Sequence, residues 1–112
     1  MPFIEKKAME SGEPLPGWVG HFCQSPEMSF VQYEIEPGAA IHEHRHDNEE
    51  VWIVVSGRLE VTVAGEARVA DAGDVVVVPR NAPHFARALT KARAIVVDHP
   101  ARDGLPGGKS RK

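Results

Sequence analysis

Apolar positions in the middle of the chain recur in short runs that turn-forming residues interrupt. The runs are rich in Val, Ile, Phe and Tyr, and Gly, Pro, Asn and Asp separate them. No window of ten or more residues carries a helical period. The pattern therefore predicts an all-β domain, either a sandwich or a small barrel. The predicted strands cover residues 18–23, 28–36, 50–57, 75–79, 84–89 and 92–99, and residues 58–74 fit a hairpin that turns at Ala64 and Gly65.

Two of these runs differ in the number of their apolar faces. In residues 58–63 only alternate positions are apolar, namely Leu59, Val61 and Val63, so one face of this strand contacts water. In residues 51–55 every position is apolar, so both faces of that strand need cover. A second sheet, the N-terminal segment or a partner subunit could supply this cover, and we expect a homodimer.

The two ends of the chain differ in composition from this β-rich body. Residues 1–17 hold three prolines, two glycines and charges of both signs, which is typical of an arm over the domain or of a flexible end. Residues 100–112 have few large apolar side chains and are rich in Gly, Pro and charge. We therefore expect an N-terminal arm at 1–17, a barrel at 18–99 and a flexible tail at 100–112.

The composition narrows the class of protein. The chain has 112 residues, enough for one domain, and a net charge of −3, without the basic surplus typical of nucleic-acid binding. Its start is charged where a signal peptide needs an apolar run, and no apolar stretch approaches the ~20 residues of a membrane span. The single cysteine, Cys23, can form no internal disulfide. We expect a cytoplasmic protein that binds neither nucleic acid nor a membrane.

Histidines and carboxylates are concentrated in residues 41–50, IHEHRHDNEE. Alternate side chains of a strand share a face, so His44 and His46 project together, about 6.6 Å apart along the backbone. Glu50 has the same parity and can add an oxygen ligand, whereas Glu49 should face away. Two imidazoles at this spacing can converge on one ion. His42 shares the parity but lies one pair further out. It could take part in the chemistry, or it could lie in solvent at the end of the strand.

A fourth ligand must come from another part of the chain, and His84 is the best candidate. Pro79, Asn81 and Pro83 build a turn before it. Three histidines and one carboxylate would hold a divalent transition ion such as Fe, Mn, Ni or Zn. Four protein ligands leave two positions of a six-coordinate ion for a substrate or for oxygen.

Two motifs of this sequence resemble those of the cupin family. The first is a glycine, five residues, His-x-His, three or four residues, Glu, six residues and glycine. The second is a glycine, five residues, Pro-x-Gly, two residues, His, three residues and Asn. Asn81 and Ala88 stand where the second motif has its later Gly and its Asn, and Asn tolerates the left-handed turn conformation. The matching residues are Gly38, His44, His46, Glu50 and Gly57 in the first motif and Gly73, Pro79 and His84 in the second.

The resemblance implies a jelly-roll β-barrel, also called a double-stranded β-helix, with a metal ion held inside by His44, His46, Glu50 and His84. Cupins include isomerases, decarboxylases and dioxygenases, so an enzyme acting on a sugar, uronate, keto acid or similar small molecule is the first hypothesis. A non-catalytic sensor of small molecules is the alternative. In small cupins that linearise unsaturated uronates, an arginine follows the last strand, and Arg102 in HPAR looks similar. Val96, Asp98 and Glu50 depart from that subgroup's pattern.

The candidates for catalytic residues are His42, Trp52 and Tyr33. Trp52 has the parity of Glu50 and should line the cavity beside the metal, or else belong to the ordinary core. Tyr33 and Gln32 lie on opposite faces of their strand, and the sequence leaves open which of them faces inward. Arg80 precedes His84 and is either solvated or able to reach a substrate carboxylate.

Overall fold

Two antiparallel β-sheets make up the fold in the computed structural model, which describes residues 2–103. Residues 2–103 contain no α-helix, and a single 3-10 turn, η1 (Lys6–Ala8), precedes the first strand. In spatial order the larger sheet holds β1 (Glu10–Leu15), β2 (Trp18–Gln24), β3 (Ser29–Ile35), β10 (Ala92–His99), β5 (Glu49–Ser56) and β8 (Val75–Val78). The smaller sheet holds β4 (Ala40–His44), β9 (His84–Ala88), β6 (Arg58–Val63) and β7 (Glu66–Asp71).

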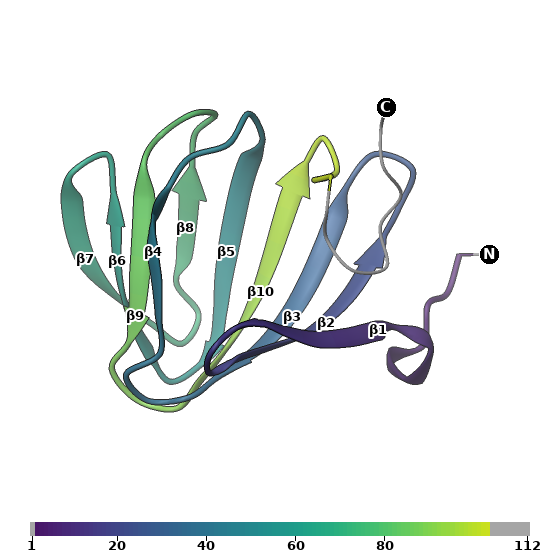
Figure 1. The fold of residues 1–112 in the computed structure, drawn as a ribbon, viewed down its shortest axis with the longest axis horizontal. Coiled ribbons are helices and arrows are strands. Elements are labelled where there is room, and N and C mark those ends of the chain that lie inside the picture. Colours follow the sequence, from purple (N-terminus) through teal and green to yellow (C-terminus); the bar gives the residue numbers. More distant parts are fainter. Residues whose placement is uncertain (1, 104–112) are drawn as a thin grey trace.

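The chain crosses between the sheets again and again, from β3 to β4, to β5, to β6 and β7, and then to β8, β9 and β10. This path makes the predicted jelly-roll barrel (Figure 1) and brings segments far apart in the sequence side by side. The predicted strands are thereby confirmed, and β1 is an additional strand within residues 1–17. No described residue belongs to a helix long and apolar enough to cross a bilayer.

The core lies between the two sheets and follows the predicted alternation. On β6 the side chains of Leu59 and Val61 are buried, while the intervening positions are more exposed. On β5 the inward Trp52 is buried against Trp18 of β2, with ring centroids 6.0 Å apart at an interplanar angle of 74°. Edge-on aromatic contacts of this kind add to the stabilisation from burial.

Two turns of the barrel have the backbone that the sequence predicts. Ala64 and Gly65 have φ angles of 48° and 85° and join β6 to β7 in a tight hairpin. Asn81, at the motif position where cupins have glycine, has a φ of 62° in the turn before β9. Asparagine therefore replaces the glycine without changing the left-handed conformation that this turn requires.

Residues 10–15 and 100–103, from the two flanking segments, pack on the barrel. The predicted N-terminal arm contributes β1, which pairs with β2 at the edge of the larger sheet. At the other end, the Asn48 side-chain amide donates to the Pro100 carbonyl at 2.6 Å, and the Arg102 backbone amide donates to Ser29 Oγ at 3.2 Å. Ala101 between them is buried. The rest of the predicted tail, residues 104–112, lies outside the described residues.

The outer face of the larger sheet remains apolar in its centre. Ile53 of β5 lies between Ile95 of β10 and Val75 of β8 in the strand register. Ile53 is 36% exposed and Val75 is 57% exposed. Val55 and Val77 are also exposed on this side. The doubly apolar strand of the sequence therefore has one face in the core and one face at the surface.

Candidate metal centre

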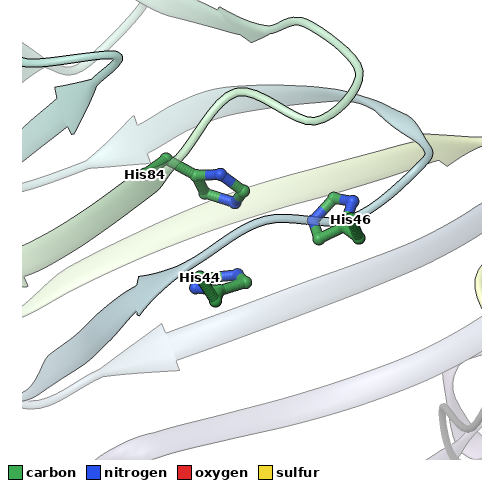
Figure 2. Close-up of side chains that lie close together, drawn as sticks. All are labelled: His44, His46 and His84. Atoms are coloured by element: carbon green, nitrogen blue, oxygen red, sulfur yellow. The ribbon is translucent and has the colours of Figure 1, made fainter.

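Three histidines converge at one end of the barrel. His44 ends β4 and His84 begins β9, and the two are direct partners in the pairing of these strands. His46 lies two residues beyond β4 and turns its ring toward the other two (Figure 2). One ring nitrogen of each histidine lies within 4.8 Å of the others. Because donor atoms about 2.1 Å from a shared ion can be at most about 4.2 Å apart, a small side-chain adjustment suffices for all three to bind.

Backbone carbonyls determine which ring nitrogen can bind a metal. His44 Nδ1 lies 2.9 Å from the His42 carbonyl oxygen, and His84 Nδ1 lies 2.9 Å from the Ala82 carbonyl oxygen. A carbonyl can only accept, so Nδ1 carries the proton and Nε2 keeps its lone pair. His84 Nε2 and both ring nitrogens of His46 are buried and have no hydrogen bond within residues 2–103. Buried lone pairs of this kind fit a metal ion.

Glu50 completes the set that the sequence predicts. Its carboxylate is 2% exposed and lies between two of the histidines, with Oε2 3.4 Å from His46 Nε2 and Oε1 3.4 Å from His84 Nε2. Neighbouring ligands of one ion lie about 3.0–3.4 Å apart, so this spacing also fits a shared ion. Trp52 Nε1 donates to Glu50 Oε1 at 2.5 Å. The neighbouring Glu49 is exposed, as predicted. The single regular strand expected for residues 42–50 is wrong, however, because β4 ends at His44 and β5 begins at Glu49 in the other sheet.

Asp98 is a buried acid that the sequence analysis did not assign to the site. It lies on β10 directly opposite Glu50 of β5, is 1% exposed, and has no hydrogen bond to either carboxyl oxygen within residues 2–103. Burial, and then the Glu50 carboxylate, raise the pKa of Asp98 to about 9. The alternation of β10, which puts Asp98 on the inward face of Ala94 and Val96, is the sequence signal that could have found it.

The pKa of Glu50 moves the other way. Burial raises it, but hydrogen bonds from the side chains around the carboxylate outweigh burial and hold this pKa well below its usual range. Glu50 is therefore the anion of the carboxyl pair and Asp98 carries the proton when no cation is present. The pKa values of two of the histidines are shifted in opposite directions. Burial lowers the pKa of His44, whereas the Glu50 carboxylate outweighs burial and raises the pKa of His84.

Arg102 reaches the site from the segment after β10. Its Nη1 lies 3.7 Å from Glu50 Oε2, and its side chain is 31% exposed. The Asn48 and Ser29 hydrogen bonds described above fix the backbone from which this side chain extends. Arg102 therefore resembles the arginine of one cupin subgroup in its place after the last strand, and it also lies beside Glu50. The residues that precede it differ from those of the subgroup.

Two cavities adjoin the histidines. An inner cavity of about 30 Å³ is lined by Tyr33, Glu50, Trp52, Asp98 and Arg102, among others. An outer cavity of about 370 Å³ is lined by the three histidines together with Pro14, Leu15, Tyr33, Ile41, His42, Arg45 and Arg102. Its size is that of a site for a small organic ligand.

The three catalytic candidates occupy different places around these cavities. Tyr33 faces inward and lines both, and burial raises its pKa to about 12, so its hydroxyl stays protonated. Trp52 lines the inner cavity and also packs in the core, so both expectations for it hold. His42 is exposed at the outer cavity, and its carbonyl oxygen, rather than its ring, contacts His44.

Other polar residues that the sequence raised lie away from the centre. Arg80 is half exposed and 3.5 Å from Asp47, and it lines neither cavity. His21 and His99 are 3.7 Å and 3.9 Å from surface glutamates. None of these side chains contributes to the cavities beside the three histidines.

The fold and this histidine-lined mouth define the class of protein as a small jelly-roll barrel with a potential metal site. The family description "Cupin domain" matches residues 31–100, which include every residue of both motifs. The chain belongs to the cupin family. An uncharacterized protein of Streptomyces coelicolor is 34% identical over 80 residues, which is 70% of this chain and 76% of that protein.

Solved structures agree with this assignment. An RmlC-like cupin from Shewanella frigidimarina is 28% identical, with a TM-score of 0.85 over 92% of this chain and 94% of that one. KdgF from Halomonas is 27% identical, with a TM-score of 0.84 over 92% of this chain and 96% of that one. Oxalate decarboxylase of Bacillus subtilis is 20% identical, with a TM-score of 0.76 over 87% of this chain and 29% of that one, and it shares the fold alone.

Proposed function

We propose that this cupin binds one divalent transition ion through His44, His46, Glu50 and His84, and that it is an enzyme acting on a small organic acid. The observation that carries the proposal is the convergence of three imidazoles, two of them with Nε2 left free by backbone hydrogen bonds, beside a buried carboxylate. These groups lie beside an outer cavity large enough for a small ligand.

The donor set limits the choice of ion. Imidazole suits Zn, Cu, Fe and Ni, and a carboxylate extends the set to Mn. The related fold of oxalate decarboxylase has Mn(II) centres, which supports Mn as one of the ions to test. A bound ion would supply Lewis-acid chemistry at the floor of the cavity.

The charge of the outer cavity favours an acid as substrate. Arg45 and Arg102 line it, and no carboxylate side chain does so among the described residues. The chain as a whole carries a net charge of −3, so the positive charge of this cavity does not follow from the overall composition of the chain. Arginine pairs with carboxylates in a defined geometry, which suits a uronate, a keto acid or a dicarboxylate.

The residues around the cavity divide the remaining tasks. Arg102 would orient the carboxylate of the substrate, since the Asn48 and Ser29 hydrogen bonds fix the backbone of its segment. Tyr33 would donate a hydrogen bond from a hydroxyl that stays protonated at neutral pH. Leu15 and Ile41 line the same cavity and would exclude water from the apolar part of the ligand.

Turnover of acids by metal-loaded protein tests this proposal. Chelator-treated protein is reloaded with Mn, Fe, Ni or Zn and incubated with uronates, keto acids, dicarboxylates and uncharged sugars, with NMR as the readout. We expect at least one acid to be converted, and Arg102→Ala to raise its KM about tenfold or more because a charge-assisted pair is lost. Arg87→Ala, at an exposed arginine outside the cavities, is the matched control.

The result also separates the enzyme from the alternative of a non-catalytic sensor. Binding of an acid without conversion by any metal form would contradict the enzyme and favour the sensor. An Arg102→Ala variant that converts the acid with unchanged KM would contradict the role of Arg102 in substrate binding.

A further inference from the structure

Glu50 and Asp98 form a buried carboxyl pair that can hold two negative charges only with enough positive charge beside it. The two residues are direct cross-strand neighbours and are 2% and 1% exposed. Like charges directly opposite each other destabilise a sheet, and two buried carboxyl groups that are both ionised need positive charge close by. Arg102 is 3.7 Å from Glu50, but it is partly exposed and supplies one positive charge for two acids.

The positions of the ligand atoms point to a cation at this place. His46, Glu50 and Asp98 each offer one ligand atom, and these atoms lie within 4.8 Å of one another. His46 also belongs to the group of three histidines, so this one side chain is shared by the two groups. No donor of residues 2–103 binds either carboxyl oxygen of Asp98, and the side chain lines the inner cavity that Glu50 also lines. A second carboxylate is therefore in place beside the ion of the proposed function.

We propose that Asp98 is a fifth protein ligand of the metal ion, so that two carboxylates and three imidazoles surround it. This inference rests on the proposed metal centre and adds a residue that the two cupin motifs do not contain. Two carboxylates balance the charge of a divalent ion, and oxygen ligands favour the harder ion Mn over Zn. With five protein ligands, a six-coordinate ion would have one position left for a substrate atom.

A structure of the Mn-loaded protein tests the ligand directly. We expect an Asp98 carboxyl oxygen within about 2.2 Å of the ion, together with nitrogens of the three histidines and an oxygen of Glu50. An ion bound by the histidines and Glu50 with Asp98 more than about 3 Å away would overturn the inference while leaving the proposed function intact. Protein that binds no ion at all would instead contradict the proposed function.

Metal affinity in solution gives a second test that does not depend on activity. Asp98→Asn keeps the shape of the side chain and removes its charge. We expect it to weaken Mn binding at least about tenfold, and to weaken Zn binding less, because Zn depends more on the histidines. Glu49→Gln removes the same charge one residue from Glu50 on the exposed face and should leave both affinities unchanged. Equal Mn affinity of Asp98→Asn and the parent protein would overturn the inference.

Discussion

At the scale of single residues, the acids of the centre differ because of what surrounds them. Glu50 accepts a hydrogen bond from Trp52 and lies against His46 and His84, so its negative charge is stabilised. Asp98 has neither a donor of this kind nor contact with water, and it faces the charge of Glu50. Two carboxyl groups at neighbouring positions therefore have pKa values shifted in opposite directions.

This difference predicts how the stability of the metal-free protein depends on pH. The pKa of Asp98 is about 9 in the folded protein, against about 3.9 for an ordinary aspartate in the unfolded chain. Between these pH values the folded state binds one proton more than the unfolded state, so the free energy of unfolding falls as the pH rises. Urea denaturation of chelator-treated protein at about pH 5 and pH 8.5 measures this fall. Asp98→Asn should remove most of it, and an identical pH dependence in the two proteins would contradict the assignment.

At the scale of strands, the larger sheet uses its two faces differently. Inward positions of β5 and β10 carry the core and the two buried acids. Outward positions of β5, β8 and β10 form a continuous apolar surface around Ile53. Exposed apolar surfaces of this kind mark places where proteins associate. A two-fold axis through such a face would bury the same residues of both subunits.

The dimer is therefore a prediction about this face of the sheet. The parent protein should have the mass of two chains by light scattering. Ile53→Lys puts a charge in the centre of the face and should give monomers, because an unpaired lysine cannot be buried between two sheets. Val69→Lys changes an exposed valine of β7, in the other sheet, and should leave the dimer intact. A parent protein with the mass of one chain would contradict the prediction.

At the scale of the whole molecule, the sequence predicts what local spacing controls. The alternation of apolar residues determines the strands, and the two motifs place His44 and His84 in the same mouth, where they are direct strand partners. The sequence could not show that β10 lies beside β5, because Asp98 and its register partner Glu50 are 48 residues apart in the chain.

 Only the pairing of β5 with β10 brings these two acids together, and such long-range pairing leaves no local pattern in the chain.

Arg102, which reaches the same site, illustrates the same limit. The composition of residues 100–112 predicts a flexible tail. Hydrogen bonds from Asn48 and to Ser29 nevertheless fix the first residues of this segment on the barrel. Both partners are distant in sequence, and neither belongs to a pattern that predicts the contact. The outer cavity depends on this contact, because it gives the cavity one of its two arginines.

The central claim is that one ion binds at the mouth of the barrel, and metal analysis of purified protein tests it most directly. The parent protein, reloaded with Mn, Fe, Ni or Zn and desalted, should retain about one ion per chain. The double variant His44→Ala/His84→Ala should retain almost none, because it loses two of the three converging imidazoles. The double variant His21→Ala/His99→Ala removes two histidines outside the site and should retain the ion. Full metal content in the His44→Ala/His84→Ala variant would contradict the account.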